Sequence, residues 1–456
     1  MTQSAVDRAS TDRYLSSLDA VVAEYEARNP RSRALHDRAQ RTLPGGNTRS
    51  GVNIDPFPVY ADRGEGAYLY DVDGHQLLDF VNNASSLILG HADPEIVAAV
   101  QNQATRGTAF SRPTAIEVEM AELLQERMPA LERVRFSSSG TEAVLNAVRV
   151  ARAYTGRPKI AKFEGAYHGI DDPVLVSYLP RLADMGPAER PHSAVSTEGL
   201  APGTTDSVLV MPFNDADASE AIISECADEL AAIIIDPLST AAGLTAPNPE
   251  FLNRLRQITE HHGILLIFDE IVSFRVHSGG THSMIDVRPD LVTLGKVIAG
   301  GTPAAAFGGR ADVMAFFDPT QGHARVWQSG TFNANPVSMA TGLLTLRRLT
   351  PEVYDKLKAR TKRLSQGLEG VFYEAGLAAR VCAIGSLFRI YFLEEIPQDF
   401  RGAMQDDFAM HRWLFLSLLN RDIYWRNGGI NALSVPTTDA EIDRLVSTVR
   451  MILTES

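Results

Sequence analysis

The sequence predicts an α/β protein in which helices cover both faces of a mostly parallel sheet. Between about residues 133 and 295, strand-like runs alternate with helix-like runs. Several strand-like runs are continuously apolar, such as the three isoleucines at 233–235, and this pattern is typical of strands that are buried on both faces. Strands of this kind that alternate with helices belong to a parallel sheet covered by helices.

An N-terminal segment of helix and β-hairpin is expected over residues 1–80. Residues 11–41 are polar and arginine-rich and predict one helix that ends before the Pro-Gly-Gly at 44–46. Short strand-like runs follow, and they are separated by Gly64–Gly66 and by the turn signal Asp73-Gly74. We therefore expect a hairpin after the helix.

The large domain is expected over residues 81–335. It opens with two helices, the second of which starts at a capping box formed by Thr114 and Glu117. The strand-like runs that follow are "RVRFSS", "KIAKF", "SVLVMPF", "LAAIIID", "ILLIFDE" and "LVTLG", and the helix-like runs between them begin at "GTEAVLNAV", "ADASEAII" and "PEFLNRLR". The irregular stretch 165–206 is long for a loop in a compact domain, so it is either a functional lid or partly disordered.

A smaller α+β domain is expected over residues 336–456. Helix-like runs there surround the strand-like run "SLFRIYF", and "TDAEIDRLVSTVRMIL" predicts a terminal amphipathic helix.

The composition of the chain limits which classes of binding partner and which cellular compartment are expected. The 456 residues include 43 basic and 56 acidic side chains, a net charge of −13, which argues against nucleic acid or an anionic membrane as the main partner. Two cysteines are too few for a disulfide framework and lack the spacing of metal ligands, so we expect no metal site. The first twenty residues lack the apolar core of a signal peptide and no run is long enough to span a membrane, so the expected location is the cytoplasm.

Lys296 is the most unusual residue in the large domain. It is one of only six lysines, and it lies between an apolar strand-like run and a pair of glycines in "LVTLGKVIAGG". A desolvated lysine has a lowered pKa and becomes a nucleophile that forms a Schiff base with an aldehyde. The alternative is a lysine that reaches solvent at a turn.

Two other features lie where a parallel sheet binds ligands, at the carboxyl ends of its strands. Asp269 closes the run "ILLIF", and "SSSGTE" lies between a strand and a helix. Ser139, Gly140 and Thr141 suit a phosphate because small residues expose backbone N–H groups at a helix start. Alone, such a turn also serves as a plain helix cap, and such an aspartate also pairs with arginine.

Together, these features predict one ligand. Lys296 suits an aldehyde, the turn at 139–141 suits a phosphate, and Asp269 suits a protonated ring nitrogen. Pyridoxal 5′-phosphate carries all three groups, and an aspartate that keeps its pyridine ring protonated makes the ring an electron sink.

Five ordered motifs from about residue 40 onward resemble the class III pyridoxal-phosphate enzymes of fold type I. They are "SSSGTEA", "FEGAYHG", "LLIFDEIVSFRV", "PDLVTLGKVIAGGTPAAAFGGRADVM" and "SGTFNANPVSMATG". The nearest subgroup contains the glutamate-1-semialdehyde aminomutases and the β-phenylalanine (β-amino acid) aminotransferases. The resemblance implies a seven-stranded, mostly parallel sheet in the large domain and a homodimer with shared active sites.

The resemblance also implies a role for individual residues. Lys296 would bond to the cofactor and move the proton, and Asp269 would pair with the pyridine nitrogen. Tyr167 would stack on the ring with His168 beside it, although both could equally be packed loop residues. Thr331 would contact the phosphate of the neighbouring subunit. The remaining cofactor residues would be Ser139, Gly140 and Thr141 at the phosphate, and Asp236 in place of the glutamate that the family usually has before a proline.

The expected substrate residues are Arg49, Asn83 and Arg426. Arg49 matches the arginine that reads a substrate carboxylate in this subgroup, and a guanidinium binds a carboxylate with two hydrogen bonds. The aminomutases have an acidic residue near the stretch "RNGGINALS" at 426–434, and this sequence has none there. The β-phenylalanine aminotransferases have a second carboxylate-binding arginine near Gly428, and Arg426 lies two residues upstream. Asn82 and Ser85 are further pocket candidates. These two and Asn83 could equally be structural residues at a strand end, and the alternative for Arg49 is an ordinary loop arginine.

The main expectation is a pyridoxal-phosphate aminotransferase with ping-pong kinetics. It would move an amino group from an amino acid, in particular a β-amino acid, to a 2-oxo acid through a Schiff base on Lys296. The first alternative is an aminomutase or racemase on the same cofactor, which needs no external amino acceptor. The second is a non-catalytic binding protein that keeps the fold. The part of 165–206 that resembles an insertion, about 180–200, is expected to act as a lid or a dimer contact.

Overall fold

The computed structural model describes residues 11–320 and 322–455, and the chain divides into two compact units. The larger unit contains residues 94–355 and 397–405, and the smaller unit combines the N-terminal region to residue 93 with residues 356–396 and 406–456. These bounds differ from the three expected segments, 1–80, 81–335 and 336–456. Residues 1–10 of the first segment lie outside the described residues.

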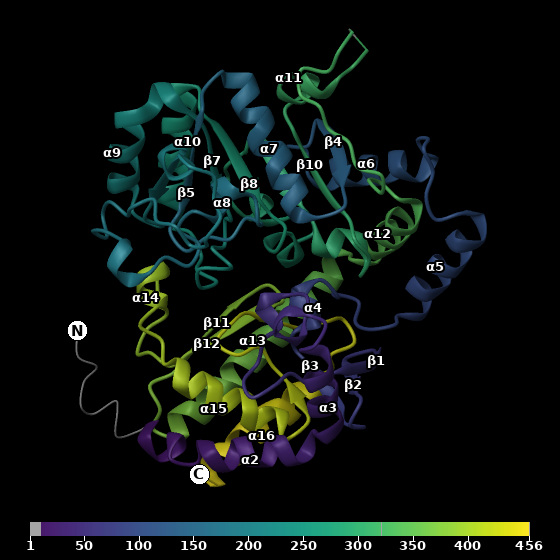
Figure 1. Ribbon diagram of the computed structural model, residues 1–456, viewed down its shortest axis with the longest axis vertical. Helices are drawn as coiled ribbons and strands as arrows, with labels where there is room; N and C mark the ends of the chain where they lie inside the picture. The colour runs from purple at the N-terminus through teal and green to yellow at the C-terminus, as the bar shows by residue number, and fades with distance from the viewer. Residues whose placement is uncertain (1–10, 321, 456) are drawn as a thin grey trace. The chain divides into compact units, whose positions relative to one another are not determined.

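The larger unit is built on a seven-stranded sheet, which confirms the expected fold class (Figure 1). The strands lie in the order β4-β10-β9-β8-β7-β5-β6, and every neighbouring pair is parallel except those that involve β10. The strand bounds are β4 (Arg133–Ser137), β5 (Lys159–Phe163), β6 (Val208–Met211), β7 (Leu230–Ile235), β8 (Leu265–Asp269), β9 (Leu291–Leu294) and β10 (Ala305–Gly309).

Strand β10 is the one strand of this sheet that the sequence did not predict. Its residues, "AAFGG", are small and carry little strand propensity. Its glycines are required because a neighbouring backbone lies very close: a Cβ on Gly308 would come within 2.3 Å of the carbonyl oxygen of Arg133. Close approach of two backbones is a recognised reason for glycine in a strand.

Helices cover the sheet on both faces, and the side chains of each strand alternate between them. Ile234 and Ile267 pack with α7 (Gly140–Thr155), whereas Ile233 and Leu266 pack with α9 (Ala216–Cys226) and α10 (Pro249–His262). The helices of this unit are α5 (Pro94–Arg106), α6 (Ala115–Arg127), α7 (Gly140–Thr155), α8 (Asp172–Leu175), α9 (Ala216–Cys226), α10 (Pro249–His262), α11 (Ala311–Met314), α12 (Pro336–Arg348) and α14 (Phe400–Ala403). The expected capping box at Thr114 and Glu117 is present at the start of α6.

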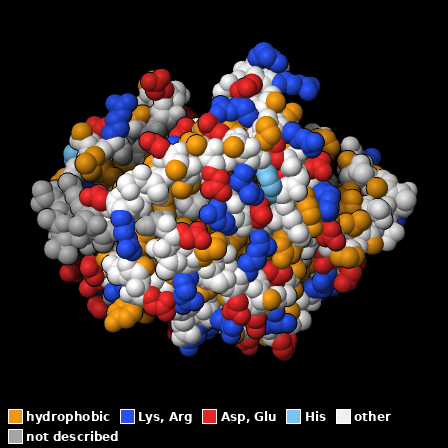
Figure 2. All heavy atoms as spheres, turned by 90° about the horizontal axis from the view of Figure 1, so that it is seen from below, with side chains coloured by type: hydrophobic (Ala, Val, Ile, Leu, Met, Phe, Trp, Pro, Cys, Tyr) orange, Lys and Arg blue, Asp and Glu red, His pale blue; other side chains and the backbone are white. Residues whose placement is uncertain are grey.

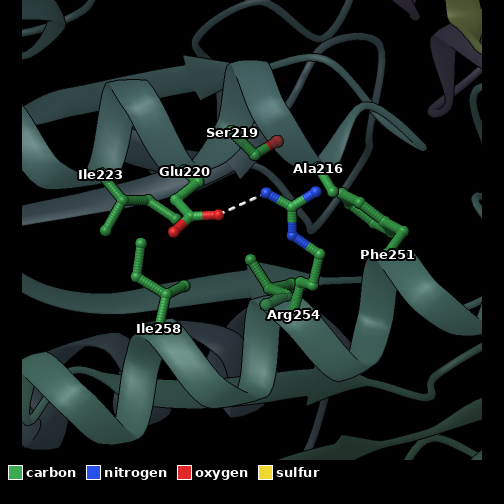
Figure 3. A pocket seen from close by; sticks show the side chains of 8 residues that line it. Ala216, Ser219, Glu220, Ile223, Phe251, Arg254 and Ile258 are labelled. Atoms are coloured by element: carbon green, nitrogen blue, oxygen red, sulfur yellow. Dashed lines mark hydrogen bonds and ion pairs between the residues drawn. The ribbon is translucent and has the colours of Figure 1, made fainter.

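Helices α9 and α10 pack side by side over one face, as Figure 3 shows. Their apolar contact is formed by Ile223, Phe251 and Ile258, and Arg254 of α10 crosses it to pair with Glu220 of α9. The hollow between these two helices has a volume of only about 10 Å³, so it is a packing defect too small for a ligand.

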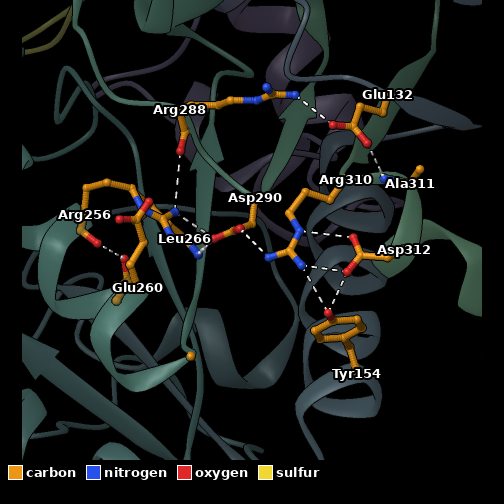
Figure 4. A network of polar contacts seen from close by, with 12 residues as sticks. Glu132, Tyr154, Arg256, Glu260, Leu266, Arg288, Asp290, Arg310, Ala311 and Asp312 are labelled. Atoms are coloured by element: carbon orange, nitrogen blue, oxygen red, sulfur yellow. Dashed lines mark hydrogen bonds and ion pairs between the residues drawn. The ribbon is translucent and has the colours of Figure 1, made fainter.

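A charged network fixes the starts of the central strands (Figure 4). The carboxylate of Asp290, which precedes β9, accepts hydrogen bonds from Arg256 at 2.8 Å, from Arg310 at 2.9 Å and from the backbone N–H of Leu266 in β8 at 2.8 Å. Asp290 is only 5% exposed. These bonds hold β8, β9 and the end of β10 in register.

The smaller unit contains two sheets. The first has the order β1-β2-β3-β13, and the parallel pairing of β3 with β13 explains why the N-terminal and C-terminal regions share one unit. The second has the order β11-β12-β14. The bounds are β1 (Ala61–Glu65), β2 (Tyr68–Asp71), β3 (Gln76–Asp79), β11 (Arg380–Ile384), β12 (Leu387–Tyr391), β13 (Ile423–Tyr424) and β14 (Asn431–Ala432). The turn at Asp73-Gly74 joins β2 to β3, as the sequence predicted.

The prediction of one helix over 11–41 is wrong, because this region breaks at Asn29-Pro30 into α2 (Leu18–Arg28) and α3 (Pro30–Ala39). Proline has no backbone N–H for the helix before it but is favourable at a helix start. The other helices of the smaller unit are α4 (Asn82–Ser85), most of α13 (Pro351–Glu374), α15 (Phe408–Leu419) and α16 (Asp439–Glu455).

Acidic and basic side chains are interspersed on the face of the molecule shown in Figure 2. Helices α13 and α16 illustrate the pattern with the ion pairs Arg363–Asp443 and Arg450–Glu374. Within the described ranges, no helix has both the length and the apolar character needed to cross a membrane.

Candidate active site

One cavity lies at the carboxyl ends of the parallel strands, with a volume of about 200 Å³. Five segments contribute to it, because β4, β5, β7, β8 and β9 all end at this edge of the sheet. Gly169, Ile271 and Val272 line the cavity, as do seven of the residues expected from the sequence. These seven are Gly140, Thr141, Tyr167, His168, Asp236, Asp269 and Lys296.

Asp269 lies at the end of β8, where three donors orient its carboxylate. One oxygen lies 2.7 Å from Nδ1 of His168, and the other accepts from the hydroxyl of Thr293 at 2.9 Å and from the backbone N–H of Ile271 at 3.2 Å. Because a carboxylate accepts, Nδ1 of His168 carries the proton. The other ring nitrogen of His168 is buried and has no hydrogen-bond partner among the described residues.

Thr293 was not predicted as a site residue, although the sequence carries a signal for it. It is fully buried in β9, within the apolar run "LVTLG". A buried hydroxyl in an apolar strand must find a hydrogen-bond partner, and the nearest functional group at that sheet edge is the aspartate of the next strand.

Lys296 follows β9 and begins a short 3₁₀ helix, η8 (Lys296–Ala299). Its backbone has φ of +50°, a left-handed conformation that is uncommon for a residue other than glycine. Strain of this kind concentrates at functional sites, where the surrounding structure holds a side chain in one direction. Gly300 permits the helix to end closely against α12, because a Cβ there would lie 2.5 Å from the carbonyl oxygen of Thr341.

The expected phosphate turn forms the start of helix α7. Gly140 and Thr141 line the cavity, so the backbone N–H groups of the first helical turn lie at its wall. The hydroxyl of Ser139 caps the helix by accepting from the backbone N–H of Glu142 at 3.3 Å. Ser139 is therefore placed as the cap of this turn rather than in the cavity lining.

Tyr167 and His168 lie in the loop after β5. Tyr167 remains 40% exposed, and its ring contacts the ring of Tyr178 at a centroid distance of 4.8 Å. Its burial on the other side raises the pKa of the Tyr167 hydroxyl. Close to the start of this loop, the carboxylate of Glu164 accepts two hydrogen bonds from Arg401, at 2.7 and 3.0 Å.

Asp236 is buried at the end of β7, and its carboxylate forms hydrogen bonds within the turn that follows. Its carboxylate accepts from the backbone N–H of Leu238 at 3.1 Å, and from the backbone N–H of Thr240 at 2.8 Å and the hydroxyl of the same threonine. Burial, together with the nearby charge of Asp269, raises the pKa of Asp236 to about 6 despite these hydrogen bonds.

Besides Ser139, four expected residues are not part of this cavity lining. Thr331 is exposed in the larger unit. Arg49, Asn83 and Arg426 lie in the smaller unit.

The three expected substrate residues are neighbours within the smaller unit. The guanidinium of Arg49 donates to the side-chain oxygen of Asn83 at 3.2 Å. Burial raises the pKa of Tyr424, and the charges of Arg49 and Arg426 both oppose that rise, so both guanidiniums act on the same side chain.

Asn83 belongs to an unusual left-handed turn, α4. All four residues from Asn82 to Ser85 have positive φ, between 47° and 69°, although none is glycine. Left-handed backbone costs roughly 1–2 kcal/mol for each such residue, so the surrounding structure must hold this turn in place.

The cavity fits pyridoxal 5′-phosphate. It brings together a helix start for the phosphate, an oriented carboxylate for the ring nitrogen, an amine for the aldehyde and a partly exposed tyrosine for the ring face. The unpartnered nitrogen of His168 adds a buried polar atom that only a ligand or water can satisfy.

Comparison with known proteins places this geometry in a family. Residues 50–407 match the family model described as "Aminotransferase class-III". Among curated proteins, the glutamate-1-semialdehyde 2,1-aminomutase of Desulforudis audaxviator is 39% identical over 421 residues, with 91% of this chain and 95% of that protein covered.

Two solved structures share the fold at substantial sequence identity. An omega-transaminase from Sphaerobacter thermophilus is 45% identical with a TM-score of 0.90, covering 93% of this chain and 97% of that chain. A β-phenylalanine aminotransferase from Variovorax paradoxus is 36% identical with a TM-score of 0.86, covering 97% of each chain.

Proposed function

Because the chain belongs to the class III aminotransferases, we propose that it transfers the amino group of a β-amino acid to a 2-oxo acid. The protein is an enzyme of this family, acts on small molecules and uses pyridoxal 5′-phosphate as its cofactor. The proposal concerns which amino group is moved, where it goes and which residues do it.

The observation that carries the proposal is the meeting of Lys296, Asp269 and the start of α7 on one cavity. When bound, the cofactor withdraws electrons from the substrate carbon that carries the amino group, so that a hydrogen on that carbon becomes acidic. Gly140 and Thr141 would hold its phosphate, with Ser139 keeping their turn in place as the helix cap.

Each of the other residues then has a specific task. The amine of Lys296 would hold the cofactor covalently until substrate replaces it, and would afterwards carry the proton between substrate and cofactor. Asp269 would stabilise the proton on the ring nitrogen. His168 and Thr293 would keep the aspartate in one orientation, and Tyr167 would pack on the ring. Asp236 would form part of the wall.

The choice of a 2-oxo acid as acceptor is supported by two observations. The omega-transaminase and the β-phenylalanine aminotransferase are similar to this chain over nearly its whole length. The stretch 426–434 also lacks the acidic residue that the resemblance leads us to expect of an aminomutase.

The curated relatives favour a second candidate, an aminomutase that moves the amino group within one molecule. They are glutamate-1-semialdehyde 2,1-aminomutases at 39–40% identity, and they support this alternative better than they support the β-amino acid reaction. A racemase would share the same first proton transfer and would also need no acceptor.

Arg49 is proposed to bind the substrate carboxylate, with Arg426 as a second cation for an acidic group. Two observations support this. Both guanidiniums lie close enough to Tyr424 to oppose the rise in its pKa, and the hydrogen bond from Arg49 to Asn83 uses only one of the five N–H donors of that guanidinium, which leaves others for a ligand.

We also propose a homodimer with shared active sites, in which Thr331 contacts the cofactor phosphate of the partner. Exposed aromatic side chains near Thr331 support an interface: Trp327 is 76% exposed and Phe332 is 59% exposed. Mixing Lys296→Ala with Thr331→Ala subunits tests it, because a mixed dimer would regain one complete site. Activity no higher than that of either parent would contradict shared sites.

A cytoplasmic location remains a proposal. The cysteine content supports it: the chain has two cysteines, too few for the disulfide framework that is common in oxidising compartments.

The deciding experiment is an acceptor test on the purified enzyme. A panel of α- and β-amino acids is incubated with and without pyruvate or 2-oxoglutarate, and products are measured by chromatography. We expect turnover of a β-amino acid only when the 2-oxo acid is present. Turnover without an acceptor would replace the proposal with an aminomutase or racemase, and a protein that binds cofactor but turns over no substrate would indicate the non-catalytic alternative.

A further inference from the structure

Lys162 is a second lysine that the proposed reaction does not use. It lies in β5 with 0% exposure and is among the largest fully buried side chains of the described chain. Lysine is almost never fully buried unless its amine is paired. No carboxylate forms an ion pair with it among the described residues, and burial lowers the pKa of its amine to about 7.

Three backbone carbonyl oxygens surround the amine of Lys162. They belong to Ala166 at 2.8 Å, Val174 at 2.9 Å and Val176 at 2.6 Å. A protonated lysine amine has three N–H donors, and a neutral one has two, so three carbonyl acceptors favour the ammonium and oppose the lowering of its pKa by burial. The amine therefore has no donor left for a substrate or cofactor, which separates Lys162 from the role of Lys296.

The three carbonyls lie at the two ends of one loop. Ala166 directly precedes Tyr167 and His168, whereas Val174 lies in α8 and Val176 follows it. The ammonium thus joins the beginning of the loop to its end, and the residues between them include Tyr167, His168 and Gly169 of the cavity lining.

The anchor of this loop is the central sheet. Lys162 is paired on β5 with Val210 of β6, and β5 also pairs with β7, so its backbone is held on both sides. One backbone bond closes the same loop, from the N–H of Gly165 to the carbonyl of Ser177 at 2.9 Å. Without the lysine amine, three inward-facing carbonyls would lose their donor, and unpaired buried carbonyls favour an opened loop.

We propose that Lys162 is a positioning residue of the cofactor site, whose buried ammonium holds the loop 166–176 closed and thereby sets Tyr167 and His168 against the cavity. His168 in turn orients Asp269 at 2.7 Å, so the effect of Lys162 reaches the ring-nitrogen side of the site. The consequence for the cofactor rests on the proposed roles of Tyr167 and His168, whereas the effect on the loop does not.

The test compares Lys162→Met with Lys159→Met in the full-length protein. Methionine matches lysine closely in length but cannot donate. Lys159 is the matched control because it lies in the same strand, pairs with Glu229 at 3.0 Å and makes no contact with the loop carbonyls. Lys162→Gln, which keeps two N–H donors on a shorter side chain, is the second variant.

Two readouts are measured for each variant. Hydrogen exchange of peptides covering 164–177, with and without cofactor, reports loop opening, and we expect at least a tenfold faster exchange in Lys162→Met than in the parent. The dissociation constant of pyridoxal phosphate is measured by fluorescence titration, and we expect about tenfold weaker binding, since small misplacement of site residues is costly. Lys159→Met should match the parent in both.

A folded Lys162→Met with unchanged exchange in 164–177 and cofactor binding within about twofold of the parent would overturn the proposal. If Lys162→Met does not fold, the same readouts on Lys162→Gln decide: faster exchange confined to 164–177 supports the proposal, and unchanged exchange overturns it. Failure of the parent protein to bind pyridoxal phosphate would reject the proposed function instead, while the exchange comparison would still test Lys162.

Discussion

Asp236 offers a quantitative test of the cavity's electrostatics. Its carboxylate is buried at the wall of the cavity, beside Asp269, and burial raises its pKa to about 6 from an ordinary value of 3.8. Asp236→Asn replaces it with a neutral side chain of the same shape. The asparagine cannot reproduce every hydrogen bond to Leu238 and Thr240, so the variant carries a constant cost in stability that does not depend on pH.

The pH-dependent part can be calculated. A raised aspartate pKa means that the folded state binds the proton more tightly than the unfolded state, so the stability from this group is complete below about pH 4 and is lost as pH rises through 6. The difference of 6 − 3.8, about 2 pKa units, corresponds to roughly 3 kcal/mol. The stability of the parent relative to Asp236→Asn should therefore fall by about this amount between pH 4 and pH 7.

The assay is urea unfolding of both cofactor-free proteins at intervals across that pH range. The relevant quantity is the difference between the two free energies of unfolding and how it changes with pH, because all other titrating groups are common to both proteins. Asp312→Asn is the control. Arg310 lowers the pKa of Asp312, so the stability of the parent relative to Asp312→Asn should rise slightly with pH. If the stability of the parent relative to Asp236→Asn stays constant or rises with pH, the electrostatic reasoning is refuted.

Three further predictions concern other parts of the enzyme. Asp290→Asn should destabilise the fold by about 3 kcal/mol in urea unfolding, because two arginines lose a buried partner, and a loss below about 1 kcal/mol would contradict this. Thr293→Val should lower the turnover rate about tenfold by removing the hydroxyl bond to Asp269, whereas Thr293→Ser should restore it; equal rates for both would reject the role. Arg49→Ala should raise KM about tenfold for an amino acid and leave an amine without a carboxylate unaffected, and an equal rise for both would exclude carboxylate recognition.

The sequence predicted the central sheet because its strands are apolar on both faces and alternate with helices. It also brought Lys296, Asp269 and Gly140 to one edge, because parallel strands end together. Strand β10 was missed because packing against neighbouring backbones, rather than propensity, places glycine and alanine in it.

A local signal and contacts formed on folding explain the other differences. The break at Pro30 is a local signal that outweighs the polar pattern around it. The pairing of β3 with β13, and the carbonyls around Lys162, depend on residues that approach only after folding. No spacing in the sequence specifies such contacts.

The left-handed turn at 82–85 is different again. Asparagine tolerates positive φ, but Ala84 does not favour it, and only the folded surroundings hold Ala84 at φ of 54°. Arg49 and Arg426 were proposed from resemblance to a family, and Asn83 was proposed from the polar run in which it lies.

The most direct test of the central claim is to find which side chain carries the cofactor. The purified enzyme is treated with borohydride, which fixes the bond between a lysine amine and pyridoxal phosphate, and is then digested and analysed by mass spectrometry. We predict one modified peptide, containing Lys296, that is absent from Lys296→Ala. A modified peptide containing Lys162 or another lysine instead, or no modified peptide, would contradict the account.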